Sequence, residues 1–105
     1  MNIPAHLLAL PTFTLGWAAL KTAPTAVLQA EVERMEAAEA TLLEYRREVI
    51  ASCVDRYNIT AGDILTGSDT AKFLAEVLYA AQEYQGPIHF LSEELEDRRL
   101  ARAPY

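Results

Sequence analysis

The chain has 105 residues and a mass of 11.7 kDa, a size that supports one hydrophobic core and therefore a single domain over residues 1–105. Hydrophobic residues make up 51% of the chain and charged residues 23%, a balance that excludes disordered and low-complexity classes. Fifteen acidic residues against nine basic ones give a net charge of -6, which opposes direct binding to nucleic acid or to anionic membranes. A protein partner with a basic surface fits this charge better.

The lone cysteine and the uncharged first twenty residues bear on the compartment. Cys53 has no partner for an internal disulfide and cannot build a zinc site alone, so we expect a reducing compartment, the cytoplasm. No Lys or Arg precedes the apolar N-terminal stretch, and Pro4, Pro11 and Gly16 interrupt it. We therefore expect neither a secretory signal nor a membrane span.

Residues 1–23 are predicted to form an apolar arm of short pieces separated by Pro11, because proline restricts the residue before it and cannot continue a helix. Its large apolar side chains must be buried, either on the helices of the same chain or on another copy. They are Leu7, Leu8, Leu10, Phe13, Leu15, Trp17 and Leu20.

Residues 24–57 are predicted to form one long helix, since they contain no glycine and no proline after Pro24 and are dominated by Ala, Glu, Leu and Arg. About 33 residues give a rod of about 50 Å. Apolar residues recur every seven positions along it, which indicates packing within a bundle or against a dimer mate. Because two further helices of about 17 residues leave part of such a rod uncovered, we expect a homodimer. The expected dimer contacts are Trp17, Leu28, Met35, Leu42 and Val49.

The rest of the chain is predicted to hold a short turn of helix at 60–66 and helices at 69–85 and 87–102. Thr60-x-x-Asp63 resembles a capping box. Gly86-Pro87 is expected to end the helix at 69–85, and Pro87 can start the next helix. The helix at 69–85 has the cleanest apolar stripe, formed by Phe73, Leu74, Val77, Leu78, Ala81 and Tyr84. The predicted fold is therefore a small all-α helical bundle with one long helix and an apolar N-terminal arm.

One stretch, "RYNITAGDILTGSDTAKFLAEVLYAAQEY", is similar in rhythm to the start of the DNA-binding domain of the bacterial replication initiator DnaA, where a comparable turn leads into a helix. The resemblance covers less than a third of the chain and implies a small helix-turn-helix DNA-binding regulator. In that family the residues after the turn are rich in arginine, which contacts phosphates. Here they are Ser68, Asp69, Thr70, Ala71 and Lys72.

Two carboxylate pairs and two histidines are the candidate catalytic or metal-binding residues of the chain. Glu33-x-x-Glu36 and Glu94-x-x-Asp97 resemble the paired carboxylates that hold magnesium in all-α nucleotide pyrophosphohydrolases similar to MazG, but no lysine or arginine stands at an evident substrate position. His6 and His89 have no Cys or His at ligand spacing. No glycine-rich phosphate loop or nucleophile elbow occurs. We expect no enzyme activity, no catalytic or metal-ligating residue and no cofactor.

The long helix instead carries a negative stripe, formed by Glu31, Glu33, Glu36, Glu39 and Glu44. Such a stripe is either a solvated helix face or a surface that meets a Lys- and Arg-lined groove on a nucleic-acid-handling partner, where carboxylates take the place of phosphates. The predicted function is a small acidic regulator or inhibitor of a host protein complex, of the kind that bacteriophages and mobile elements encode, as anti-CRISPR proteins are. The alternatives are the DNA-binding regulator, a structural or assembly component, and the magnesium-dependent hydrolase.

Overall fold

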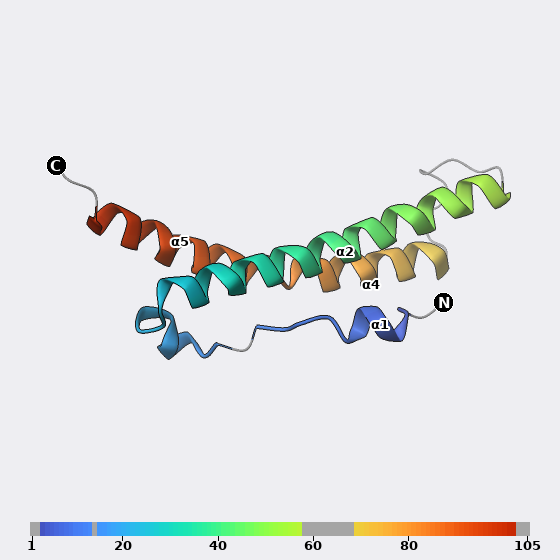
Figure 1. Cartoon of the computed structure of the whole chain (residues 1–105). Coiled ribbons are helices and arrows are strands. Elements are labelled where there is room, and N and C mark those ends of the chain that lie inside the picture. Colours follow the sequence, from blue (N-terminus) through green and yellow to red (C-terminus); the bar gives the residue numbers. More distant parts are fainter. Residues whose placement is uncertain (1–2, 14, 58–68, 103–105) are drawn as a thin grey trace.

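One long helix, α2 (Thr25–Tyr57), forms the spine of the molecule (Figure 1). The structure, a computed structural model, describes residues 3–13, 15–57 and 69–102. Within these ranges the regular elements are all helical: α1 (Ala5–Leu8), the 3-10 helix η1 (Trp17–Lys21), α2, α4 (Asp69–Gln82) and α5 (Gln85–Arg102). The predicted all-α fold is confirmed. The turn predicted at 60–66 lies outside the described residues.

The bounds of α2 agree with the prediction within one residue. Pro24 stands just before the helix, and its carbonyl oxygen accepts bonds from the backbone nitrogens of Val27 and Leu28, at 3.0 and 3.2 Å. A proline is tolerated there because the first helical turn has no internal acceptor for its missing N–H. The helix then runs for 33 residues, about 50 Å.

Helices α4 and α5 lie one after the other along one side of α2 (Figure 1). They contain 14 and 18 residues, together 32, almost as many as the 33 of α2. The break between them falls at Glu83 and Tyr84, and the predicted separator Gly86-Pro87 lies instead inside the first turn of α5. The reason is again that the first turn of a helix accepts proline.

The core lies between α2 and this in-line pair. Leu28, Met35 and Leu42 of α2 are 0%, 0% and 3% exposed, and they meet an equally buried stripe from the other two helices. That stripe consists of Phe73, Leu74, Val77, Ala81 and Leu91.

This burial removes one reason for expecting a dimer contact at these positions. Leu28, Met35 and Leu42 are covered by helices of their own chain, because α4 and α5 lie in line and together nearly match α2 in length. Val49 is half-buried and packs against the same core. The side chain of Trp17 is not among those described. Leu28, Met35, Leu42 and Val49 therefore supply no exposed apolar seam that a second copy must cover, and the homodimer remains a prediction.

The N-terminal arm packs on its own chain, which was one of the two alternatives left open by the sequence. Leu7 is 5% exposed and belongs to one core cluster with Leu42 and Phe73. Farther along the arm, the hydroxyl of Tyr84 donates to the carbonyl oxygen of Pro11 at 2.8 Å. The arm thus runs beside the bundle from α1 to η1 (Figure 1).

The resulting shape is long and thin. Its principal extents are 58 × 30 × 19 Å, and its radius of gyration is 17.9 Å, whereas a compact domain of 105 residues has about 13 Å. The accessible surface is 7031 Å², against about 5,900 Å² for a compact monomer of this mass. Much of each helix therefore faces outward. Among the described residues, no helix combines the length and apolarity that crossing a bilayer requires.

Candidate protein-binding surface

The five glutamates of the predicted negative stripe do not share one face of α2. Glu33, Glu36 and Glu44 are exposed, Glu39 is half-buried, and Glu31 is only 4% exposed. Glu31 lies three residues after Leu28 and four before Met35, a spacing that puts it on the core side of the helix. The prediction that Glu31 points outward is therefore wrong. Its carboxylate accepts a bond from Arg34 Nη1 at 3.1 Å.

The outward carboxylates form a surface that we call the acidic face of α2, defined by Glu33, Glu36, Glu44 and Glu48. The sequence analysis missed Glu48, although its position one turn after Glu44 is a signal that could have identified it. Arg47 binds the Glu44 carboxylate through Nε at 3.1 Å and Nη2 at 2.8 Å. Four carboxylates thus stand against one guanidinium, which leaves the face with three uncompensated negative charges.

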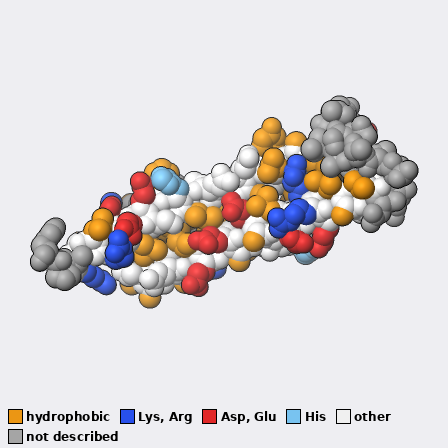
Figure 2. All heavy atoms as spheres, turned by 90° about the horizontal axis from the view of Figure 1, so that it is seen from above, with side chains coloured by type: hydrophobic (Ala, Val, Ile, Leu, Met, Phe, Trp, Pro, Cys, Tyr) orange, Lys and Arg blue, Asp and Glu red, His pale blue; other side chains and the backbone are white. Residues whose placement is uncertain are grey.

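Two of these carboxylates are fully available to a partner. Neither Glu33 nor Glu36 makes a side-chain hydrogen bond or ion pair to another described residue. Exposed alanines, Ala37 and Ala40, stand between the glutamates, so a partner can approach the helix closely. Figure 2 looks down on the molecule and shows acidic side chains spaced along its middle, with basic side chains mainly toward the two ends. The arrangement favours contact with a cationic surface.

A groove between α2 and α5 adjoins this face. It has a volume of about 640 Å³ and is lined by Glu36 and Glu39 from one helix and by Gln85, His89 and Ser92 from the other. His89 Nε2 lies 3.5 Å from a carboxylate oxygen of Glu93. Its two carboxylates accept hydrogen bonds only, so the Glu36 and Glu39 side of the groove extends the surface on which a Lys or Arg side chain can rest.

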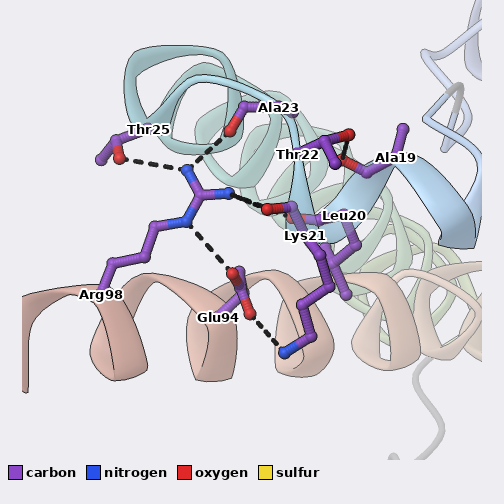
Figure 3. Close-up of polar contacts among 8 residues, drawn as sticks. All are labelled: Ala19, Leu20, Lys21, Thr22, Ala23, Thr25, Glu94 and Arg98. Atoms are coloured by element: carbon purple, nitrogen blue, oxygen red, sulfur yellow. Dashed lines mark hydrogen bonds and ion pairs between the residues drawn. The ribbon is translucent and has the colours of Figure 1, made fainter. Parts of the chain in front are cut away.

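The second buried carboxylate has a different role. Glu94 is 7% exposed and pairs with Lys21 Nζ at 2.6 Å and Arg98 Nε at 3.1 Å (Figure 3). Arg98 also donates to four oxygens where η1 passes into α2: the carbonyls of Leu20, Lys21 and Ala23 and the hydroxyl of Thr25. We call this set the Arg98 clamp. It ties the end of the arm to α5.

The carboxylate of Glu94 in the Arg98 clamp is fully paired with cationic side chains. The hydrogen bond from Lys21, aided by Arg98, lowers the pKa of the Glu94 carboxyl below its ordinary value of 4.5 despite burial. The same hydrogen bond raises the pKa of Lys21. Because Glu94 is fully engaged, it is not free to act as an acid, a base or a metal ligand.

The structure does not assemble the carboxylate pairs that resemble those of the pyrophosphohydrolases. Glu33 and Glu36 face outward on α2, whereas Glu94 is held in the Arg98 clamp. Across residues 3–13, 15–57 and 69–102, no cluster of three or more His, Cys, Asp or Glu side chains is placed to hold a metal ion. Cys53 is half-buried.

The helix that resembles a DNA-reading element is α4, and its first exposed side chains are mixed in charge: Asp69, Lys72 and Glu76. The turn before it lies outside the described residues.

Comparisons with known proteins add no relative: the sequence matches no protein-family model, and neither a curated protein nor a solved structure is detectably similar to it.

Proposed function

We propose that the protein is a non-enzymatic binding protein that docks the acidic face of α2 onto a basic surface of another protein. The observation that supports this is the placement of four exposed carboxylates, with one cation among them, on a helix whose opposite side is packed. From Glu33 to Glu48 the row extends about 22 Å, at 1.5 Å per residue. The class that fits best is a small acidic regulator or inhibitor of a nucleic-acid-handling complex, of the bacteriophage or anti-CRISPR type.

Carboxylates can take the place of phosphates on a surface that binds nucleic acid. A groove that binds nucleic acid is lined by Lys and Arg, and its potential attracts any ordered row of negative charges. A rigid helix presents such a row without the entropy cost of ordering a loop. Association driven in this way is fast at low ionic strength and weakens as salt screens the charges.

The test is affinity capture from a host lysate with matched charge variants. The bait carries Glu33→Lys and Glu36→Lys, and the control bait carries Glu93→Lys and Asp97→Lys, two exposed positions on α5. Both double variants change the net charge equally, from -6 to -2, since each of two reversals adds two charges. We expect a basic protein captured by the wild type and the control to be lost from the Glu33/Glu36 bait. Equal loss from both baits would show non-specific attraction and would refute the assigned face.

The DNA-binding alternative makes a separate prediction. With a net charge of -6 and a single lysine, Lys72, near the start of α4, the chain has no cluster of cations at this helix to hold phosphates. Fluorescence anisotropy with a labelled duplex should show no binding at physiological salt. Sub-micromolar binding that weakens steeply with salt would instead establish the DNA-binding regulator.

A further inference from the structure

An apolar pocket of about 340 Å³ opens between the N-terminal arm and the helices. Leu8 and Leu10 form its arm side, Met35 and Leu42 of α2 lie at its base, and Ala80 and Glu83 line the opposite wall. Leu8 is 69% exposed at this site. The volume lies within the range of sites that take a small ligand or one large side chain, about 300 to 1,000 Å³.

Charged side chains stand on one side of the pocket, opposite the arm. The first twenty residues carry no formally charged side chain, so the arm side is neutral. The opposite side carries Glu83, which follows the last residue of α4 and lines the pocket, and Glu76 stands one turn before the lining residue Ala80; both glutamates are exposed. Neither carboxylate has a hydrogen bond or salt bridge to a described residue.

Tyr84 adjoins both the carboxylate of Glu83 and the apolar lining of the pocket. It lines the pocket, and its hydroxyl donates to the carbonyl oxygen of Pro11 at 2.8 Å, which holds the two sides together. Burial, followed by the nearby charge of Glu83, raises the pKa of the Tyr84 hydroxyl. Glu83 lines the pocket together with Tyr84, so its carboxylate can act on whatever enters there.

We propose that this pocket binds a segment of a partner protein that inserts one large apolar side chain between the arm and α4 and places a neighbouring Lys or Arg against Glu83. The apolar lining supplies the anchor, as buried aromatic or aliphatic side chains do at the centres of interfaces. Glu83 at the pocket, with Glu76 farther along α4, then favours a cationic neighbour and disfavours an anionic one, because like charges repel. The apolar lining also distinguishes this site from the acidic face of α2.

The site is independent of the proposed docking face. Glu33 stands two residues from Met35, about 200° around α2, so this end of the acidic face points away from the pocket. Glu44 and Glu48 border the arm at a separate hollow that is also lined by His6 and Leu7. A fatty acyl chain would fit the apolar volume, but its carboxylate or phosphate headgroup would meet Glu83, and the whole chain carries net charge -6. The charge therefore favours a cationic protein segment over an anionic lipid.

The experiment uses a fluorescent peptide with Trp-Leu between two pairs of lysines, a second peptide with glutamates in place of the lysines, and a third with serines in place of Trp-Leu. Binding is measured by anisotropy, and its location by NMR on protein labelled at the methionine methyl groups, one of which is Met35. We expect saturable binding of the lysine peptide with a shift of the Met35 resonance. The glutamate peptide should bind at least about five-fold more weakly, and the serine peptide should not move that resonance.

Substitutions in the chain test the apolar contact in the pocket and the charge contact at Glu83 separately. Ala80→Phe fills the pocket and should weaken binding of the lysine peptide at least about ten-fold. Glu83→Lys should weaken its binding at least about five-fold. The matched charge control Glu33→Lys, on the other side of α2, should leave its affinity within about two-fold. Should Ala80→Phe fail to fold by circular dichroism, Leu8→Ala serves in its place, because Leu8 is exposed and its truncation leaves the core intact.

Three results would overturn the inference. The first is absence of a Met35 shift with every peptide. The second is equal weakening by Glu83→Lys and Glu33→Lys, which would mean general attraction to a negative protein. The third is a Met35 shift with phosphatidylcholine vesicles and none with the lysine peptide, which would make the occupant a lipid chain. None of these outcomes depends on the partner of the acidic face, so the inference can fail while the proposed function stands.

Discussion

A substitution at Leu42 can distinguish a core position within one chain from a contact between two chains. Leu42 is 3% exposed and belongs to a cluster with Leu7, Phe73 and Val77. Truncation to alanine removes about three carbons from a site that α2, α4 and the arm enclose. A transfer loss of about 1.5 to 3 kcal/mol, plus the cavity left behind, gives an expected decrease of about 2 to 5 kcal/mol in the free energy of unfolding. That is a large fraction of the stability of a domain this size, about 5 to 15 kcal/mol.

The assay is urea unfolding followed by circular dichroism at two protein concentrations about a hundred-fold apart. Leu8→Ala is the matched control: the same change is made in the arm, at a side chain that is 69% exposed, and should cost less than about 0.5 kcal/mol. A midpoint that is independent of concentration, with a large loss only for Leu42→Ala, is expected. A wild-type midpoint that rises with concentration, together with a variant midpoint that does not, would place Leu42 in a dimer contact and refute this assignment.

Three further predictions concern the buried face of α4, the Arg98 clamp and the pH dependence of stability. Leu74→Ala, at a fully buried position, should cost about 2 to 5 kcal/mol in the same denaturant assay, whereas Tyr79→Ala at a 64% exposed position should be nearly neutral. Arg98→Met should lower the free energy of unfolding by about 2 kcal/mol or more, because Met keeps the aliphatic packing and loses every hydrogen-bond donor. Arg98→Lys should lower it by less. Equal stability of the wild type and both variants would contradict the clamp. The folded-state pKa of Glu94 is lowered, so its contribution should be complete above about pH 4.5 and disappear as the pH falls through the folded pKa. Unfolding midpoints measured from pH 7 to pH 3 should therefore drop less for Glu94→Gln than for the wild type, and parallel curves would argue against this coupling.

Local features of the chain predicted the helices well, and they failed where the answer depended on a neighbour. The bounds of α2 follow from a run without glycine or proline, and the buried face of α4 follows from the spacing of Phe73, Leu74 and Val77. The predicted helix at 69–85 ends three residues beyond α4, because Gly86-Pro87 was expected to end it, whereas both residues lie in the first turn of the next helix, where proline is tolerated. Periodicity alone does not distinguish the end of one helix from the first turn of the next.

The reasoning for the dimer contact met the same limit of sequence patterns. A seven-residue repeat shows which side of α2 is apolar, but it does not say what covers that side. Here the cover is α4 followed by α5 in line, an arrangement set by the short break at Glu83 and Tyr84. Glu31 was placed outward because it was grouped with other glutamates by sequence distance, whereas its angle around the helix puts it beside the core.

The shape of the molecule also separates the residues that stabilise it from those available for recognition. Because the bundle is only 19 Å across in its thinnest direction, α2 is packed on one side and open on the other along most of its length. Stability therefore depends on Leu28, Met35 and Leu42, while Glu33 and Glu36 on the open side contribute no contact to the described core. Charge reversal at these two glutamates is expected to leave unfolding nearly unchanged, within about 0.5 kcal/mol, since exposed sites without partners rarely cost more. A loss of partner capture in a variant of unchanged stability would then report on recognition alone, which is the condition under which the acidic face of α2 can be assigned or rejected.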